Sequence, residues 1–136
     1  MNDCIFCKII KGEIPSTKIY EDNNFLAFLD IAPVNFGHTL IIPKEHFKDT
    51  LETPDEILSE LIIVGKRIGG ALIKSLPAEG FNLSTNNGEV AGQVVFHTHF
   101  HIIPRRMDDG LTHWPKKEYK EGEAGEVAEK IKKAIE

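Results

Sequence analysis

Three histidines stand at alternate positions in one short segment, at His97, His99 and His101. A neutral imidazole is a good nucleophile toward phosphorus, and a neighbouring imidazole can stabilise phosphate charge or protonate a leaving group. Because histidine titrates near neutral pH, a row of imidazoles can supply both forms. A solvated surface and a single zinc ion held by the three rings are two further interpretations. The segment therefore predicts phosphoryl or nucleotidyl transfer, with these two alternatives open.

The chain contains two cysteines, Cys4 and Cys7. Their spacing fits a redox pair, half of a zinc site, or two buried thiols. A redox pair normally follows a strand, and the three residues before Cys4 leave no room for one, which disfavours that interpretation. A zinc site needs two further ligands, so the pair alone does not define one.

Composition excludes several classes of protein. The chain has 136 residues and a formal net charge of −5, which argues against extended nucleic acid as a partner. A single domain over residues 1–136 would bury about two-thirds of its surface without a disulfide framework. Apolar runs are too short to span a membrane and a signal-peptide pattern is lacking, so we expect a cytoplasmic protein without a membrane partner.

The elements that must position these side chains begin with a short helix over residues 4–10, where the apolar residues are helically spaced. Asp22, Asn23 and Asn24 form a turn between the runs 18–21 and 25–29, which predicts a β-hairpin. The β-branched run 39–43 predicts a buried strand. These elements form the N-terminal part of the expected sheet.

A long amphipathic helix is predicted after residue 53. Thr53, Pro54 and Glu56 form a capping box with proline at the first helical position. Apolar residues then recur at helical spacing up to residue 76, and Pro77 ends the helix. Residues 81–85 alternate like a half-buried strand, and a loop of small residues follows over 87–92.

The histidine row is predicted to lie on one strand. Residues 93–103 alternate apolar and polar, which places the three imidazoles on one face, and Pro104 ends the strand. Apolar residues over 125–135 predict a C-terminal helix within a highly charged segment. The order of elements predicts an α+β fold, with an antiparallel meander sheet and one long crossing helix.

The histidine row also resembles the motif of a known family. His-Thr-His-Phe-His and the two isoleucines that follow it are similar to the histidine-triad (HIT) motif of the nucleotide-binding branch. Residues 28–33, residues 37–46 and the pair Gly92–Gln93 also resemble that family. The likeness covers residues 4–115 and leaves a charged extension beyond them. It implies the HIT fold and a homodimer that shares one continuous sheet.

The resemblance implies roles for individual residues. His99 matches the nucleophile that attacks the α-phosphorus, forming a nucleotidyl-imidazole that water then hydrolyses. His101 matches the residue that contacts the phosphate and assists the leaving group, and His38 matches a remote fourth active-site histidine. Asp30 matches the acidic residue that holds the ribose hydroxyls, although such a residue before a turn is commonly a turn former.

Two further sets of residues match binding positions of the family. The positions that match the apolar slot for the base are Ile5, Phe6, Ile9, Phe28 and Ile31. The positions that match the phosphate loop are Asn86, Gly92, Gln93 and Val94, where backbone N–H groups can face an anion. Without the resemblance, the slot residues would be interpreted as core and the loop as a plain connection.

Some members of the family hold zinc through a cysteine pair, a histidine after the Ile-Pro strand and the first histidine of the triad. The matching residues are Cys4, Cys7, His46 and His97. The resemblance therefore implies a structural Cys2His2 zinc site of the bacterial type, which leaves His99 and His101 for the reaction.

The activity that the resemblance implies is hydrolysis of a purine nucleotide, such as an AMP derivative, with release of an amine or phosphate from the nucleoside 5′-monophosphate. Two alternatives are a dinucleoside polyphosphate hydrolase and a non-catalytic adaptor whose binding depends on a nucleotide. Val94 stands where several members carry a small hydroxyl residue, so the preferred leaving group is not predicted.

Overall fold

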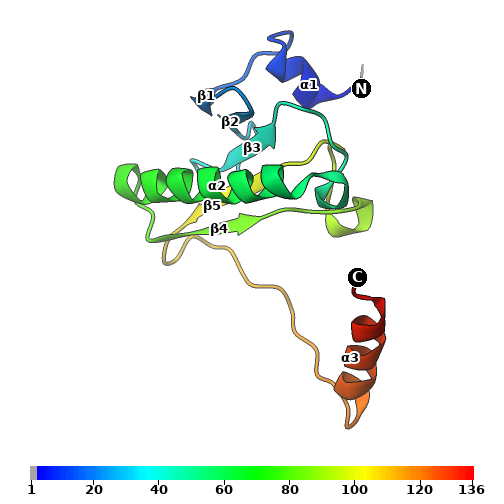
Figure 1. Cartoon of the computed structure of the whole chain (residues 1–136). Coiled ribbons are helices and arrows are strands. Elements are labelled where there is room, and N and C mark those ends of the chain that lie inside the picture. The colour runs from blue at the N-terminus through cyan, green and yellow to red at the C-terminus, as the bar shows by residue number, and fades with distance from the viewer. Residues whose placement is uncertain (1–2) are drawn as a thin grey trace.

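The computed structural model describes residues 3–136. Its centre is a five-stranded antiparallel sheet with strand order β1-β2-β3-β5-β4 (Figure 1). The strands are β1 (Lys18–Glu21), β2 (Phe25–Leu29), β3 (Thr39–Pro43), β4 (Gly80–Ser84) and β5 (Phe100–Arg105). The helices are α1 (Ile5–Ile10), α2 (Asp55–Ser75) and α3 (Glu123–Ala134), with short 3-10 turns η1 (Thr50–Glu52) and η2 (Glu89–Ala91). The predicted α+β class, with its short N-terminal helix and long crossing helix, is confirmed.

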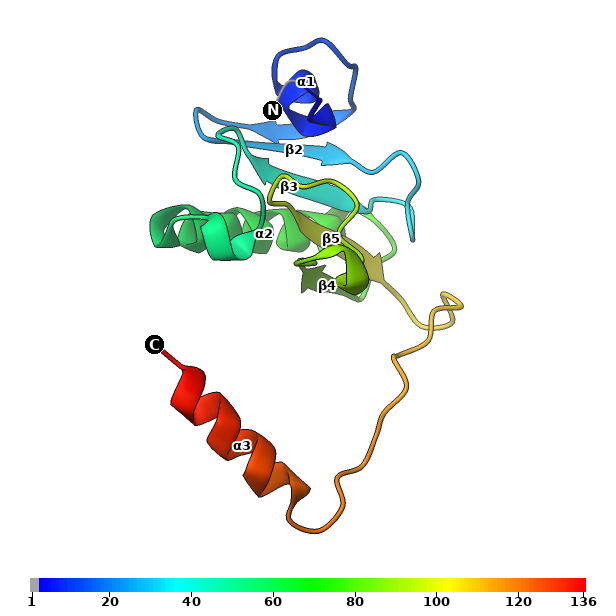
Figure 2. The ribbon, with the colours of Figure 1, turned by 90° about the vertical axis from the view of Figure 1, so that its right-hand side faces the viewer.

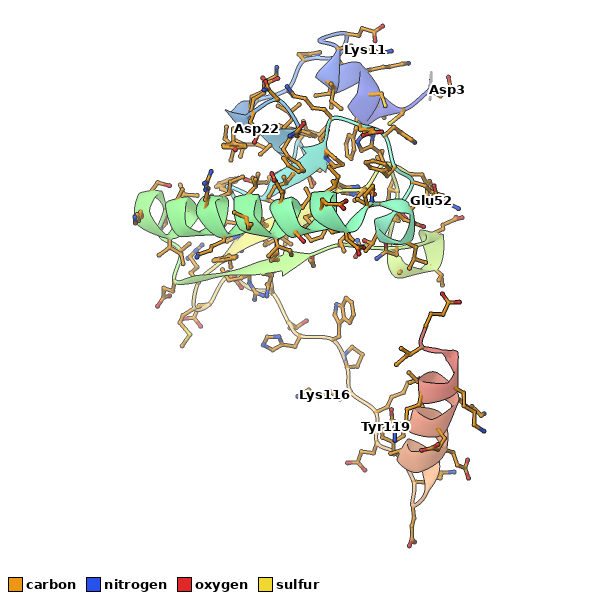
Figure 3. All side chains as sticks on the ribbon, viewed as in Figure 1. Asp3, Lys11, Asp22, Glu52, Lys116 and Tyr119 are labelled. Carbon is orange, nitrogen blue, oxygen red and sulfur yellow. The ribbon has the colours of Figure 1, made fainter. Side chains whose placement is uncertain are left out.

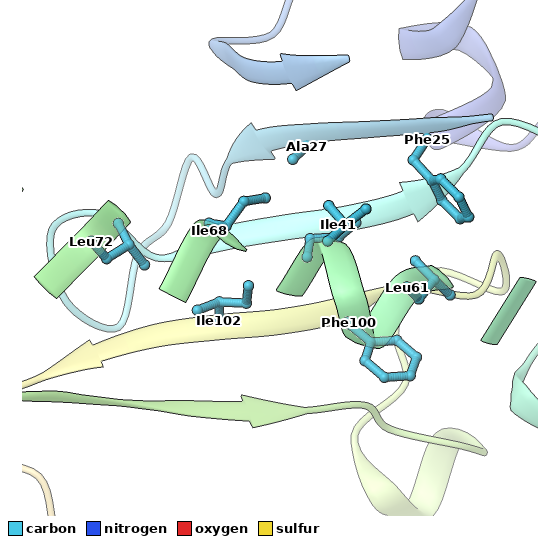
Figure 4. Packing of buried hydrophobic residues seen from close by; sticks show 9 residues of the cluster. Phe25, Ala27, Ile41, Leu61, Ile68, Leu72, Phe100 and Ile102 are labelled. Carbon is cyan, nitrogen blue, oxygen red and sulfur yellow. The ribbon is translucent and has the colours of Figure 1, made fainter. Parts of the chain in front are cut away.

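One hydrophobic core lies between α2 and the sheet (Figure 4). The buried residues of α2 recur at helical spacing, so one stripe of the helix faces the strands. At Gly69 the helix approaches β4 so closely that a Cβ atom would clash with the Phe81 ring. The core residues are Phe25, Ala27, Ile41, Leu61, Val64, Ile68, Leu72, Phe100 and Ile102. This packing holds β5, which carries the last histidine of the row, firmly in the sheet.

A second core lies on the opposite face of the sheet, beneath α1. Phe6 and Ile9 of α1 are buried there against alternate residues of β2 and β3, and the partners on the strands are Leu26, Phe28, Leu40 and Ile42. Because both faces of β2 and β3 are covered, these strands form nearly continuous apolar runs instead of alternating. The packing also anchors α1, and with it Cys7, on the sheet.

The β-hairpin prediction is confirmed. One carboxylate oxygen of Asp22 accepts hydrogen bonds from the N–H groups of Asn24 and Phe25, each at 2.7 Å. Such bonds from an aspartate side chain to its own turn are local, so the sequence signal was sufficient.

The predicted capping box at the start of α2 is wrong. The helix begins at Asp55 with Pro54 as its N-cap and without a side-chain capping bond. The Thr53 hydroxyl instead bonds the carbonyl of Asp49 and the hydroxyl of Thr98, each at 2.7 Å. A tertiary contact therefore uses the side chain that the local pattern assigned to the cap.

The predicted strand over 93–103 is also wrong in its bounds, because β5 spans Phe100–Arg105. The Gln93 side chain accepts from the N–H of Gly88 and donates to the carbonyls of Lys48 and Val95, which folds the preceding segment into an irregular loop. His97 and His99 therefore precede the strand. Pro104 lies within β5, opposite Phe81, and does not end it.

The chain leaves the sheet after β5 and ends in α3, close to the helix predicted over 125–135. Figures 1 and 2 show a long extended connection that carries α3 past β4 and away from the body. Over residues 3–136, each helix is too short or too polar to cross a membrane.

Candidate active site and metal centre

The pairing of β3 with β5 brings two histidines together. His38 directly precedes β3, and His101 lies on β5 opposite Leu40. Nε2 of His38 is 3.0 Å from Nδ1 of His101. The centroid of the His99 ring is 5.1 Å from that of His101. We refer to His38, His99 and His101 as the histidine cluster.

Hydrogen-bond partners assign the tautomers of His38 and His101. The backbone N–H of Val34, which can only donate, lies 3.1 Å from Nδ1 of His38. In the neutral ring the proton of His38 is therefore on Nε2, which donates to Nδ1 of His101. His101 consequently carries its own proton on Nε2. The two rings form a relay that ends in an N–H able to reach a ligand.

His99 has the opposite arrangement. Its Nδ1 lies 2.7 Å from the carbonyl oxygen of His97, which can only accept, so the proton is on Nδ1 and Nε2 keeps a lone pair. The Phe6 ring meets the His99 ring nearly edge-on, at a centroid distance of 5.0 Å. These contacts fix both the tautomer and the orientation of an unprotonated ring nitrogen.

Burial lowers the pKa of all three imidazoles. The pKa of His101 falls to about 4, because burial disfavours the charged ring and the charges of His99 and His38 add to this effect. The negative charge of Asp30 raises the pKa of all three imidazoles. Since burial is the larger effect, the rings are neutral at neutral pH, and the 3.8 Å contact of Asp30 with His38 is not an ion pair.

A second cluster lies at the other end of the histidine row. It brings together four side chains whose sulfur or Nδ1 atoms lie within 4.8 Å of one another: Cys4, Cys7, His46 and His97. Cys4 is the N-cap of α1, and its sulfur accepts from the Cys7 N–H at 3.4 Å, which holds the cysteine pair together. We refer to these four residues as the cysteine–histidine cluster.

The spacing within this cluster fits a tetrahedral metal ion. His46 Nδ1 lies 3.1 Å from His97 Nδ1 and 3.4 Å from Cys7 sulfur. Cys4 sulfur is 3.5 Å from His97 Nδ1. Ligand atoms bound to zinc at about 2.0–2.3 Å in a tetrahedron lie roughly 3.3–3.8 Å from one another. Two thiols and two imidazoles are also a donor set that zinc prefers.

Groups around the cluster favour the same interpretation. Nε2 of His97 lies 2.8 Å from the carbonyl of Pro43, so it carries the proton and leaves the Nδ1 lone pair toward the cysteines. Burial lowers the pKa of His97 to about 4, which keeps the ring neutral as a ligand. Burial and the neighbouring Cys4 raise the pKa of Cys7, a cost to the thiolate that a bound cation would offset.

Comparison with known proteins places this geometry in a family. Residues 11–108 match the HIT domain family model. The chain belongs to the HIT family. Among curated HIT relatives, the adenosine 5′-monophosphoramidase HNT1 of Candida albicans is 42% identical over 138 residues, covering 97% of this chain and 91% of its own. The adenylylsulfatase HINT3 of Arabidopsis thaliana is 49% identical over 110 residues, covering 81% of this chain but only 56% of its own length.

Solved structures match the fold over nearly the whole chain. SMU.412c of Streptococcus mutans has 46% sequence identity and a TM-score of 0.92, and the alignment covers 100% of this chain and 87% of that one. A zinc-bound histidine triad protein of Mycobacterium smegmatis has 40% identity and a TM-score of 0.79, covering 98% and 99%. These matches confirm that the predicted family and fold are correct.

The residues matched to the HIT base slot lie around α1 and the end of β2. Phe6, Ile9 and Phe28 are buried in the second core, so they can offer only an edge to a ligand. Ile5 is 50% exposed and Ile31 is 98% exposed, which leaves both free to cover a planar group. Asp30 adjoins Ile31, and its carboxylate accepts from the Ala32 N–H at 2.9 Å. Its role toward ribose stays a prediction.

The residues matched to the HIT phosphate loop surround η2. Gly88 and Gly92 have positive φ angles, which only glycine adopts readily, and Asn86 donates to the Gly92 carbonyl. Gln93 is buried, and its side chain holds the loop in place. The N–H groups of Gly92 and Gln93 donate within the loop, so an anion would have to replace those bonds. Val94 is exposed beside them.

Sequence reasoning missed four groups that position the histidines. The carbonyls of Pro43 and His97 and the N–H of Val34 select the tautomers. The hydroxyl of Thr85 donates to the His99 carbonyl at 2.8 Å. Three of the four are backbone groups, which every residue type offers, so no sequence signal could have found them. The threonine, in the predicted strand, carried no signal of its partner.

Proposed function

We propose that this chain is a nucleotide hydrolase that releases an amine or phosphate from a nucleoside 5′-monophosphate. The observation that carries the proposal is the pairing of an unprotonated Nε2 on His99 with an N–H on the adjacent His101. The names of two relatives, an adenosine 5′-monophosphoramidase and an adenylylsulfatase, support an adenylyl group as the part that is transferred.

In the first step, the Nε2 lone pair of His99 attacks the α-phosphorus and the bond from phosphorus to the leaving group breaks. The backbone carbonyl of His97 accepts a hydrogen bond from Nδ1–H of His99. It thereby stabilises the positive charge that develops on the His99 ring. The His99 side chain is only 6% exposed, which keeps bulk water away from the ring. The product of this step is a nucleotidyl-histidine and the free leaving group.

The hydrogen-bonded pair of His38 and His101 supplies the proton that the leaving group needs. The anionic phosphate raises the pKa of these imidazoles on binding, so the pair takes up one proton with the substrate. His101 Nε2 gives that proton to the leaving amine. In the second step water attacks phosphorus, the bond to His99 Nε2 breaks, and the water proton returns to His101. Atoms and charges then balance, and His99 regains its lone pair.

The nucleoside is positioned by residues that flank the cluster. We propose that the base packs against exposed Ile5 and Ile31 above the edges of Phe6, Ile9 and Phe28. The Asp30 carboxylate accepts from the ribose hydroxyls, and the phosphate lies beside the loop from Asn86 to Val94. A purine fits this arrangement because its two fused rings can contact both isoleucines.

We propose that zinc occupies the cysteine–histidine cluster. The ion would supply a structural cross-link between α1, His46 after β3, and His97. It would thereby fix Phe6 and the His97 carbonyl, the two groups that hold the His99 ring. The zinc-bound HIT structure supports this assignment. Thiol ligands persist in reducing compartments, which favours a cytoplasmic protein.

The decisive experiment is to trap the covalent intermediate. The metal-loaded protein is mixed with adenosine 5′-phosphoramidate, quenched within milliseconds and digested, and the peptides are weighed. We expect one adenylyl group on the peptide that contains His99. Parallel reactions with adenylyl sulfate and a diadenosine polyphosphate rank the leaving groups. Absence of the adduct with all three substrates, despite nucleotide binding, would support the adaptor alternative and overturn the proposal.

We also propose that the protein is a homodimer with one continuous sheet. β4 forms an edge of the sheet and, among residues 3–136, pairs with β5 alone. Unpaired edge groups are ready to pair with another strand. Beside that edge, α2 leaves Ile62, Ile63 and Ile73 between 41% and 52% exposed. Two copies joined at their β4 edges would cover both features, and sedimentation equilibrium showing a monomer at micromolar concentration would contradict this.

A further inference from the structure

The carboxylate of Asp109 is buried, although it lies in the turn after β5 and outside both clusters. Its side chain is 3% exposed. One oxygen accepts from Nε of Arg105 at 2.7 Å, from Nδ2 of Asn35 at 3.1 Å and from the Arg106 N–H at 3.3 Å. The other accepts from Nη2 of Arg105 at 3.2 Å and from the Leu111 N–H at 3.1 Å. Five hydrogen bonds therefore converge on a carboxylate that has no part in the proposed reaction.

These donors keep Asp109 ionised. The hydrogen bonds from the Arg105 guanidinium and the Leu111 N–H hold the pKa of the Asp109 carboxyl well below its usual range. In the five bonds each oxygen accepts from N–H groups alone, so an amide at this position would turn its NH2 group toward other donors. The turn is also tight, since Asp108 has a φ of 61°, which is uncommon for a residue with a side chain. The carboxylate thus fixes the turn and the Asn35 amide together.

Asn35 connects this turn with the loop before β3, which comprises residues 31–37. Its Nδ2 also donates to the carbonyl of Pro104 on β5 at 2.8 Å. The connection is made just before the chain leaves the sheet, and Figure 3 shows Lys116 and Tyr119 on the extended segment that follows. One side-chain amide therefore joins the loop before β3 to the end of β5.

The loop before β3 has little apolar packing of its own. Val34 and Phe36 are 47% and 91% exposed, so their side chains bury little surface against the sheet. At the end of the loop, Gly37 has a φ of 100° and lies so close to Leu76 that a Cβ atom would clash. Close packing thus holds the end of the loop, and the hydrogen bonds of Asn35 hold its middle.

The same loop determines where His38 carries its proton. The Asn35 carbonyl accepts from the His38 N–H at 3.0 Å, and the Val34 N–H donates to Nδ1 of the His38 ring at 3.1 Å. The Val34 N–H keeps the His38 proton on Nε2, which directs the proton of His101 to its own Nε2. If the loop shifted, His38 would be free to carry its proton on Nδ1. His101 would then turn its proton toward His38 and away from a ligand.

We propose that Asp109 and Asn35 are positioning residues for the proton donor on His101. The Asp109 carboxylate fixes the Asn35 amide, and Asn35 fixes the loop before β3. The loop in turn keeps the Val34 N–H on the His38 ring. The inference rests on the proposed hydrolase function, because it concerns the proton that the leaving group receives. Its effect is confined to substrates whose leaving group needs that proton.

NMR measures the tautomer of His38 without a substrate. In metal-loaded protein with isotope-labelled histidine, long-range proton–nitrogen correlations distinguish the protonated ring nitrogen from the bare one. For the wild type we expect the His38 proton on Nε2. Asn35→Ala should raise the population with the proton on Nδ1 at least tenfold. An unchanged tautomer in this variant would overturn the inference.

Asn82→Ala is the matched control. The Asn82 side chain accepts from Nη1 of Arg105 at 2.9 Å, so this variant also removes a hydrogen bond from the residues around Asp109. Among the hydrogen bonds of residues 3–136, Asn82 makes none to the loop before β3. The control should therefore leave the His38 tautomer unchanged. A shift as large as that of Asn35→Ala would show that any damage to this region suffices, and would contradict the inference.

Kinetics test the consequence for the leaving group. Asn35→Ala should lower kcat for adenosine 5′-phosphoramidate at least tenfold. The same variant should lower kcat for the p-nitrophenyl ester of AMP less than twofold, because p-nitrophenolate leaves without a proton. Asn82→Ala should change both values less than twofold. Equal losses with the two substrates in Asn35→Ala would indicate a merely structural role and overturn the inference.

Asp109→Asn is a second variant of nearly the same size. Its NH2 group would meet the donors that now face a carboxylate, so it should release the Asn35 amide and shift the His38 tautomer in the same direction. Thermal unfolding shows which variants are folded at the assay temperature. An active wild type with an unchanged tautomer in both variants would contradict this inference alone. A wild type without hydrolase activity would contradict the proposed function, whatever the tautomer of His38.

Discussion

The histidine cluster and the cysteine–histidine cluster draw on one five-residue segment, yet they use opposite nitrogens of the imidazole ring. His97 has its Nε2–H on the Pro43 carbonyl and turns Nδ1 toward the cysteines. His99 has its Nδ1–H on the His97 carbonyl and keeps Nε2 free. The difference lies in which ring nitrogen meets a main-chain acceptor. Residue type alone therefore does not separate a metal ligand from a nucleophile.

Burial acts on both clusters in the same direction. It lowers the pKa of His97 and of His101 to about 4, so these two rings are neutral near pH 7. A neutral ring can bind a metal or attack phosphorus, and the tautomer decides which. His97 belongs to the cysteine–histidine cluster but also contacts the histidine cluster, since its ring faces the cysteines while its carbonyl orients His99.

The largest expected effect separates the two clusters most clearly. His99→Gly removes the proposed nucleophile and should lower kcat/KM by at least about 10³-fold. The metal content should stay unchanged, because His99 is not among the four clustered ligands. Steady-state kinetics and metal analysis check this. His113→Gly, at an exposed residue between β5 and α3, is the control. Loss of metal in the His99 variant would refute the separation.

The second effect tests whether His101 donates the proton to the leaving group while His99 acts as the nucleophile. His101→Gln removes the proton donor and should cost about 10²–10⁴ in kcat for a substrate with an amine leaving group. A nucleotide ester of p-nitrophenol leaves without needing a proton, so its rate should fall far less. The ratio of the two rates is the measurement. Equal losses for both substrates would show that His101 does not protonate the leaving group.

The third effect is on stability. Cys4→Ser combined with Cys7→Ser should abolish zinc binding and lower the free energy of unfolding by about 4 kcal/mol when free zinc is 1,000 times the dissociation constant. A chelator should lower the Tm of the wild type and of the control Lys8→Ser, but not that of the double variant. If the chelator has no effect on the wild type, the cysteine–histidine cluster is not a structural metal site.

The smallest expected effect is on the pH dependence of stability, which reports the pKa of His101 in the histidine cluster. His101 has a folded pKa of about 4 against an ordinary value of 6.5, so below pH 6.5 the unfolded chain binds a proton that the folded chain excludes. Stability present above pH 6.5 is therefore lost as the pH falls toward 4. His101→Gln should flatten this dependence by up to about 1.4 kcal/mol per pH unit. Urea unfolding at several pH values measures it, and parallel curves would contradict the neutral, buried ring.

Local signals explain which parts of the fold the sequence predicts. The turn at Asp22 and the helical stripe of α2 depend on neighbours within a few residues, and both predictions are confirmed. The strand over 93–103 is wrong because its alternation has another cause. Gln93 and Thr98 are buried by distant partners, Lys48 and Phe47, and not by pairing with a neighbouring strand.

The site was only partly predictable for a similar reason. The spacing of the histidine row indicated phosphorus or metal chemistry, but the separate roles of His97 and His99 came from the family resemblance. The structure supplies the physical difference, in hydrogen bonds to the carbonyls of Pro43 and His97. Every residue type has the same backbone atoms, so the sequence does not reveal which residue provides such a contact. The roles of Asp30 and of the phosphate loop stay predictions.

The acceptor that orients His99 belongs to the main chain, and this has an evolutionary consequence. Any amino acid at position 97 would present the same carbonyl oxygen. Cys4, Cys7 and His46, by contrast, are useful as ligands only together. A lineage could therefore discard the metal, replace all four ligand side chains and keep the nucleophile's tautomer. The hydrolytic chemistry proposed for His99 is in this sense separable from the zinc ion proposed for the cysteine–histidine cluster.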